Sequence, residues 1–189
     1  MTPSVLEAAG ADIPQAARVL ASAFEEYPWT RWTIPAEEYS ERLEALQAIY
    51  LRHALDHGIV LIERDGHGVA AFLAPGAPAP SEADQARIAV LMGDRLAALV
   101  ATGLPEHPAG AWELATIGVD PARWGQGVAS SLLSDGLRRL DAVGATTVLE
   151  TSDPRNVTLY SRHGFAVEVT TNIPSGPVVH TMRRPAQHT

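Results

Sequence analysis

The sequence reads Arg123-Trp124-Gly125-Gln126-Gly127-Val128-Ala129-Ser130 at the point where a predicted strand gives way to a predicted helix. Glycines at a helix N-terminus let backbone N–H groups converge on an anion, and the helix dipole adds favourable potential. The stretch therefore suits a pyrophosphate, although an ordinary strand–helix turn has the same composition. Two dinucleotide-binding patterns do not fit, because Ser130 replaces the third Gly of Gly-x-Gly-x-x-Gly and the chain lacks the Lys of a P-loop.

The segments around this stretch predict a β-α-β unit. Residues 111–119 form an apolar strand that Pro121 ends, and 128–143 carry apolar residues at helical spacing up to Gly144, which is expected at the C′ position. A β-branched run at 146–151 predicts the next strand. This order implies parallel or splayed strands with helices on their faces.

The remaining segments are predicted from periodicity and turn residues. Asp12-Ile13-Pro14-Gln15 is typical of a capping box, so a helix is expected from Ile13 to Phe24. Apolar runs on either side of an Asp-Gly turn predict a hairpin. The other expected elements are helices at 36–57, 81–101 and 156–163, hairpin strands at 59–63 and 69–73, a loop at 102–110, and strands at 165–171 and 178–183.

Composition restricts the possible chemistry. The chain has 189 residues, which predicts a single domain spanning 1–189. It contains no Cys and no Lys, which excludes disulfides, thiolate nucleophiles, Cys-bound metals and Schiff-base lysines. A net charge of −8 argues against nucleic-acid or anionic-membrane partners. We expect a cytoplasmic protein, because no apolar run approaches the ~20 residues of a membrane span and residues 1–10 lack a secretory pattern. The His residues show no ligand-like spacing, so no metal is predicted.

The glycine-rich stretch resembles the cofactor loop of the GCN5-related N-acetyltransferase (GNAT) superfamily, Arg/Gln-x-x-Gly-x-Gly/Ala. Gly127 and Ala129 match the last two fixed positions, whereas Trp124 stands where Arg or Gln is usual. Residues 113–121 resemble the superfamily's central strand. Downstream, Asn156, Tyr160 and Gly164-Phe165 resemble its Asn…Tyr-x-x-x-Gly-Phe signature, although Asn156 precedes Tyr160 by four residues where many members have seven.

Three blocks extend the resemblance over most of the chain. Residues 23–31, 112–121 and 149–156 occur in the order found in the puromycin-acetylating branch of the superfamily. The resemblance implies an α/β (α+β) GNAT fold, with a mixed central sheet of about six to seven strands, a splayed parallel pair and helices on both faces. It also implies acetyl-CoA as co-substrate. The cofactor-binding residues it implies are Ile117, Gly118, Val119, Arg123, Trp124, Gly125, Gln126, Gly127, Val128, Ala129, Ser130, Asn156 and Tyr160.

The resemblance further implies direct attack of an acceptor amine on the thioester. Glu113 is the expected general base, and strand alternation predicts that it shares a face with Ala115 and Ile117. Its alternative role is an ion pair with an Arg that holds the sheet. Tyr160 is the expected general acid for the CoA thiolate, with a packing phenol as the alternative. Asn156 has the alternative role of helix N-cap.

A cluster of aromatic residues follows the first predicted helix. We expect these side chains to wall the acceptor site and to stack on a flat ring, or else to pack in the core: Phe24, Tyr27, Trp29 and Trp32. The expected acceptor is a small-molecule amine, with puromycin or a similar aminonucleoside or antibiotic as the candidate. Protein or peptide N-acetylation and a non-catalytic acyl-CoA-binding module are the alternatives. The chain is expected to be a monomer or homodimer.

Overall fold

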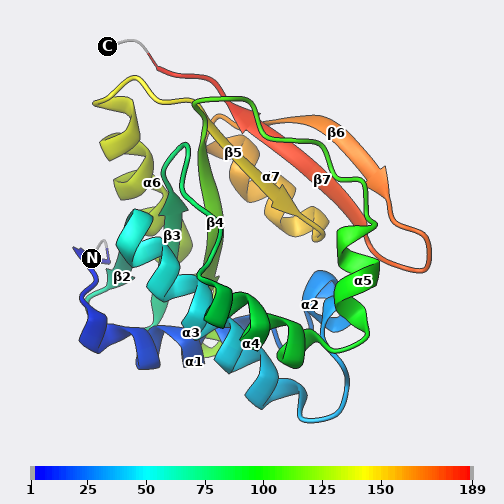
Figure 1. Ribbon diagram of the computed structural model, residues 1–189. Helices are drawn as coiled ribbons and strands as arrows, with labels where there is room; N and C mark the ends of the chain where they lie inside the picture. Colours follow the sequence, from blue (N-terminus) through cyan, green and yellow to red (C-terminus); the bar gives the residue numbers. More distant parts are fainter. Residues whose placement is uncertain (1–2, 188–189) are drawn as a thin grey trace.

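The computed structural model describes residues 3–187 and has a central seven-stranded sheet in the order β1-β2-β3-β4-β5-β7-β6 (Figure 1). Its only parallel pair is β4–β5, and every other pair is antiparallel within the described residues. The strands are β1 (Val5–Glu7), β2 (Gly58–Glu63), β3 (Gly68–Leu73), β4 (Trp112–Val119), β5 (Thr147–Thr151), β6 (Ala166–Asn172) and β7 (Val178–Arg184).

The parallel pair is paired at one end only. Trp112 lies opposite Thr147 and Glu113 opposite Val148, and no further residues of β4 and β5 are paired. Beyond Glu113 the two strands part and leave backbone groups of β4 without a strand partner. The predicted mixed sheet with a splayed parallel pair is therefore confirmed.

Helices cover both faces of the sheet, because alternate side chains of β2 and β3 enter different cores. Val60 and Val69 pack with side chains of two helices on one face, and Leu61 and Ala70 pack against another helix on the opposite face. The α-helices are α1 (Ile13–Ala23), α2 (Pro28–Thr33), α3 (Tyr39–His57), α4 (Glu82–Met92), α5 (Arg95–Val100), α6 (Val128–Asp141) and α7 (Pro154–Arg162). The first face carries α1 and α3, and the second carries α6 (Figure 1).

Three details of the helices differ from the sequence-based expectations. The Asp12 carboxylate accepts the backbone N–H of Ala9 at 2.8 Å and makes no side-chain cap to α1, because it belongs to a preceding 3₁₀ turn, Gly10–Asp12. The helix expected at 81–101 is divided into α4 and α5 at Gly93, whose φ of +54° interrupts the helical path. Gly144 lies beyond the position expected for it, because α6 has its C-cap at Ala142.

The sequence analysis also missed two short elements and misplaced one helix start. No expectation covered β1 or α2, each of which is too short to show a periodic pattern. The helix expected from residue 36 begins at Tyr39, since Glu38 adopts a left-handed conformation with φ of +52°. Within residues 3–187, no helix combines the length and the hydropathy that crossing a bilayer requires.

A β-bulge interrupts β4. Thr116 lies opposite Ala71 and Leu114 lies opposite Phe72, so Ala115 is an extra residue without a partner on β3. A bulge of this kind reverses the alternation of side chains that follow it and bends the strand.

The bulge overturns one expectation about the site. Leu114 and Ile117 both pack toward the α6 core, although an unbroken strand would place them on opposite faces. Glu113 therefore does not share a face with Ile117. Since Glu113 precedes the bulge, its carboxylate is on the other side of the sheet from Leu114, where α1 and α3 lie.

Candidate active site

A cavity of about 680 Å³ lies beside the parting strands β4 and β5. Its walls come from α2, α3, the Pro-rich segment 74–80, the loop 107–111 and the bulged part of β4. Cavities of this size are typical of small-molecule sites. The cavity brings together Glu113 of β4 with Asn156 and Tyr160 of α7.

The glycine-rich stretch forms an open turn at the start of α6. Gly125 and Gly127 have φ values of +76° and +82°, which side chains rarely adopt. Five of its amides have no hydrogen-bond acceptor within residues 3–187, namely those of Gly125, Gly127, Val128, Ala129 and Ser130. Unpaired amides at a helix N-terminus attract anions, so this turn has the chemistry to bind a diphosphate.

The side chains of the turn secure it to its surroundings. The Trp124 indole Nε1 donates to the Val119 carbonyl at 2.8 Å, and Gln126 Nε2 donates to the Ala122 carbonyl at 3.4 Å. Arg123 Nη2 lies 3.4 Å from the His67 ring. These three side chains therefore hold the turn to its surroundings, and none of the five unpaired amides takes part in their contacts.

The edge of β4 left free by the splay presents alternate backbone groups. The Asp120 amide donates at 2.8 Å to the carbonyl of His67, the residue that precedes β3, so this amide points toward β3. Alternation then directs the amides of Gly118 toward β3 and those of Ile117 and Val119 toward the open edge. Gly118 has a steric role, because a Cβ there would stand 2.7 Å from Leu20 Cδ2 of α1.

Glu113 is one of two carboxylates that flank an imidazole. His107 Nδ1 lies 3.8 Å from Glu113 Oε2, and His107 Nε2 lies 3.4 Å from Glu150 Oε1. Glu113 is on β4, Glu150 on β5 and His107 in the loop before β4, so the imidazole bridges the parting strands. Within residues 3–187 Glu113 has no Arg partner, and the alternative of a structural Glu–Arg pair is therefore wrong.

The surroundings of Glu113 and His107 raise the pKa values of both groups. Burial raises the pKa of Glu113, the nearby His107 opposes this shift, and the negative charge of Glu150 adds to it. The hydrogen bond to Glu150 raises the pKa of His107, burial opposes this, and Glu113 adds to the rise. Sequence reasoning missed both His107 and Glu150, because their proximity depends on how the loop folds over the strands.

Tyr160 lines the cavity from α7 and is 5% exposed. Its ring packs edge-on against Phe165 with centroids 6.0 Å apart. The hydroxyl makes no hydrogen bond to the part of the chain that the structure describes. Burial raises its pKa, with smaller contributions of the same sign from Tyr27 and Asp153, so the phenol stays protonated at neutral pH.

Asn156 lies within α7 and lines the same cavity. The N-cap of α7 is Asp153, whose carboxylate accepts the Arg155 amide at 2.8 Å. The alternative of Asn156 as helix N-cap is therefore wrong, and its side chain is not occupied by that role.

Three of the four aromatic candidates line the cavity. Phe24 and Tyr27 pack with ring centroids 5.2 Å apart, and Trp29 lies beside them. Trp32 is not among the lining residues and instead packs on Trp29 at 5.8 Å and beside Gly176 in the β6–β7 loop.

The Tyr27 hydroxyl ties α2 to the end of β5. It accepts the Ser152 amide at 2.9 Å and shares a hydrogen bond with Thr151 Oγ1 at 3.0 Å. The acceptor wall is thus connected directly to the strand that parts from β4.

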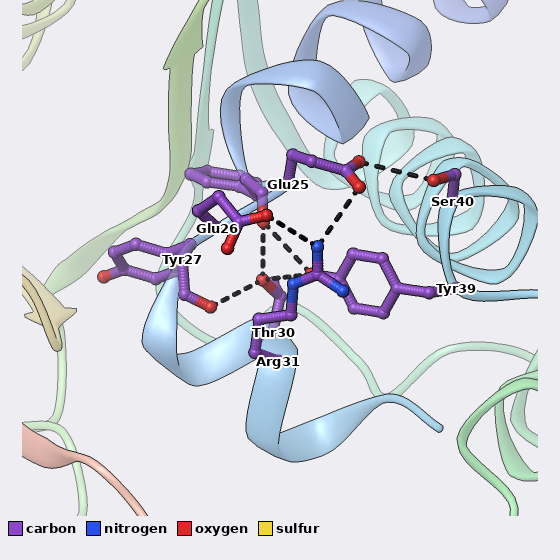
Figure 2. A network of polar contacts seen from close by, with 8 residues as sticks. Glu25, Glu26, Tyr27, Thr30, Arg31, Tyr39 and Ser40 are labelled. Carbon is purple, nitrogen blue, oxygen red and sulfur yellow. Dashed lines mark hydrogen bonds and ion pairs between the residues drawn. The ribbon is translucent and has the colours of Figure 1, made fainter. Parts of the chain in front are cut away.

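Figure 2 shows a polar network that joins α2 and the segment before it to α3. Arg31 pairs with Glu25 at 3.2 Å and with Glu26 at 2.9 Å, and its guanidinium stacks 3.9 Å from the Tyr39 ring centroid. The Thr30 hydroxyl accepts from the Tyr39 hydroxyl at 2.8 Å. Since Arg31 neutralises the two carboxylates and neither lines the cavity, they form part of the support of α2.

The sequence matches the model of the acetyltransferase (GNAT) family over residues 21–165, and the chain belongs to this family. GNAT enzymes are acyltransferases that use acetyl-CoA and act on acceptor amines.

Among the residues that the structure describes, no group of three or more His, Asp or Glu side chains is arranged to hold a metal ion.

Solved structures share the fold along the whole chain. A Corynebacterium glutamicum protein, described as histone acetyltransferase HPA2 and related acetyltransferase, is 26% identical with a TM-score of 0.80, covering 100% of this chain and 99% of that one. The PaiA N-acetyltransferase of Thermoplasma acidophilum, solved with coenzyme A, is 14% identical with a TM-score of 0.63, covering 98% and 99%. The ribosomal-protein-S18-alanine N-acetyltransferase of Escherichia coli is 16% identical with a TM-score of 0.57, covering 100% and 96%.

Proposed function

We propose that this protein transfers the acetyl group of acetyl-CoA to the amine of a small molecule by direct attack in a ternary complex. The observation that carries the proposal is that the open amide turn follows the end of the splayed strand β4, while the cavity lies along the earlier residues of the same strand. A thioester carrier that runs along this strand has its diphosphate at the turn and its acyl carbon at the cavity.

The donor is held by backbone groups. The free amides of the turn bind the diphosphate, assisted by the dipole of α6. The open edge of β4 at Ile117 and Val119 pairs with the pantetheine arm as an added strand would. One of these amides polarises the thioester carbonyl and stabilises the oxyanion that forms on attack.

Two side chains move protons. Glu113 takes a proton from the acceptor ammonium through a water molecule, and its raised pKa suits a base that works near neutral pH. The neutral amine then forms a bond to the acyl carbon, and the carbon–sulfur bond breaks. Tyr160 donates its phenolic proton to the departing CoA thiolate, and the second proton that leaves the amine nitrogen as the amide forms restores the phenol through solvent. Fixing donor and acceptor beside each other supplies much of the acceleration.

The acceptor that fits best is a compact aromatic amine of the puromycin type. Phe24, Tyr27 and Trp29 offer faces for a flat ring. An α-amino group has a pKa of about 7.7–8.0, so a weak base suffices to deprotonate it. The resemblance of residues 23–31, 112–121 and 149–156 to puromycin-acetylating enzymes also supports this acceptor class.

The test is release of free CoA thiol from acetyl-CoA by the purified protein with different acceptors. Puromycin and small aromatic amines should accelerate thiol release well above the rate without acceptor, and mass spectrometry should find the monoacetylated product. Peptides with free N-termini should react more slowly. Preferential acetylation of peptides, or thiol release that no amine accelerates, would contradict the proposal.

A further inference from the structure

Gln47 is a buried amide side chain in the wall of the cavity. It lies in the middle of α3 and is only 8% exposed. With Tyr50 and His53 it occupies positions three residues apart, which places all of them on one side of the helix, and all of them line the cavity.

The carboxamide of Gln47 has no hydrogen-bond partner among residues 3–187. Neighbouring polar groups in the same wall are already used, since Thr30 Oγ1 donates to the Phe24 carbonyl at 2.9 Å and Thr33 Oγ1 donates to the Trp29 carbonyl at 2.9 Å. Among the described residues, the side-chain polar atoms that have neither a partner nor any exposed surface belong to Thr147, Thr181 and Arg183. The Gln47 carboxamide is not one of these, so it keeps some exposed surface. Because Gln47 lines the cavity, a ligand in the cavity can reach its carboxamide.

A buried amide without a protein partner is costly, so a ligand group that pairs with the Gln47 carboxamide gains affinity. A carboxamide presents a donor and an acceptor side by side, which matches another amide or the edge of a nucleobase. We therefore expect the Gln47 carboxamide to pair with a neutral amide or with the edge of a nucleobase.

The charges around the cavity exclude anionic acceptors. All 14 basic residues of the chain are Arg, and within residues 3–187 none of them lines the cavity, whereas Glu113 and Glu150 do. The imidazole of His107 also lines the cavity, but it already lies between Glu113 and Glu150. A carboxylate or phosphate on the acceptor would therefore be desolvated beside these carboxylates without an Arg to pair with.

We propose that Gln47 is a specificity-determining residue: its carboxamide hydrogen-bonds a neutral amide or amide-like edge of an aromatic amine that carries no carboxylate or phosphate. This inference rests on the proposed function, because it assigns the acceptor class of the same cavity. The amine of such an acceptor lies toward Glu113, and its ring lies among the aromatic side chains of α2 and the segment before it.

The experiment compares three acceptors that share one aromatic ring and one amine. L-Phenylalaninamide carries the neutral amide, phenethylamine lacks it, and L-phenylalanine replaces it with a carboxylate. The value measured is kcat/KM for each acceptor with the wild-type protein and with Gln47→Leu. Dividing the wild-type value by the variant value cancels differences in amine pKa and intrinsic reactivity.

We expect Gln47→Leu to lower kcat/KM on the order of tenfold for phenylalaninamide, as expected for one lost hydrogen bond, and to change it less than about threefold for phenethylamine. Phenylalanine should be a poor acceptor of the wild-type protein. The KM for acetyl-CoA should not change. The matched variant Gln47→Met keeps the length of the side chain and lacks both the donor and the acceptor, so it gives the same readout if the leucine variant does not fold.

If the ratio of wild-type to Gln47→Leu kcat/KM is the same for phenylalaninamide and phenethylamine, the role of Gln47 is overturned and the proposed function stays in place. Acetylation of phenylalanine as efficient as that of its amide would overturn the exclusion of anions. Failure of the wild-type protein to acetylate any small amine would overturn the proposed function and this inference together.

Discussion

The indole Nε1 of Trp124 donates a hydrogen bond to the carbonyl of Val119 at 2.8 Å and so joins the glycine-rich turn to the end of β4. Trp124 stands where the family pattern has Arg or Gln, and the residue is 54% exposed. The indole therefore fastens the turn to the strand that precedes it.

Trp124→Phe keeps an aromatic ring and removes the donor. Because the turn loses one support, we expect the Kd for acetyl-CoA to rise roughly three- to tenfold, as for a single hydrogen bond, with little change in kcat. Calorimetric titration with acetyl-CoA measures the Kd. An unchanged Kd would mean that the backbone alone maintains the shape of the turn.

Tyr160→Phe separates catalysis from stability. The Tyr160 hydroxyl makes no hydrogen bond to residues 3–187, so its removal should leave the free energy of unfolding nearly unchanged, while kcat falls by about 10²- to 10⁴-fold through loss of the general acid.

Tyr39→Phe is the matched control. The Tyr39 hydroxyl donates to Thr30 Oγ1 at 2.8 Å and to the Phe24 carbonyl at 3.1 Å. It lies outside the cavity lining, and its loss should cost about 1 kcal/mol of stability with kcat retained. Denaturant unfolding and steady-state kinetics of both variants test this, and a full kcat in Tyr160→Phe would remove its role as the acid.

His107→Gln should move the pH profile in a defined direction. A base acts in its ionised form, so kcat/KM falls as the pH drops through the pKa of Glu113. A protonated His107 lowers that pKa against the larger effect of burial. Removing the imidazolium therefore raises the pKa of Glu113. The acidic limb of the pH profile of kcat/KM should then move to higher pH by roughly one unit at low salt.

The comparison uses one acceptor throughout, so that the titration of its amine is common to every profile. His180→Gln is the matched control, because His180 pairs with Thr170 on β6, outside the cavity lining. Its profile should match that of the wild type. A limb that stays in place, or moves to lower pH, in His107→Gln would show that Glu113 is not the titrating base.

Two glycines at opposite ends of α6 separate backbone strain from cofactor binding. Gly127 has φ of +82° and Gly144 has φ of +64°, and no atom lies within 4 Å of a Cβ built on either. Alanine should cost about 1–2 kcal/mol of stability at each position. Only Gly127→Ala should weaken acetyl-CoA binding, because its methyl group and altered φ disturb the amide turn. Equal affinities in the two variants would contradict binding at this turn.

The elements predicted well from the sequence are those whose signals are local. The β2–β3 hairpin follows from two apolar runs around Asp65-Gly66, and α6 follows from apolar spacing after Gly127. The turn before α6 and the position of Tyr160 in α7 were likewise found from short motifs. Periodicity, glycine conformation and turn chemistry act between neighbours in the chain, so they can be recognised without knowing how the chain folds.

Tertiary structure alone decided which side chains share the site. The unpaired Ala115 reversed the alternation of β4 and separated Glu113 from the face of Ile117. His107 and Glu150 meet across 43 positions of the chain, and Gln47 reaches the cavity from a helix distant in sequence. Such contacts depend on sheet order, loop path and bulge position, which are set by packing of the whole chain and leave no pattern in any one segment.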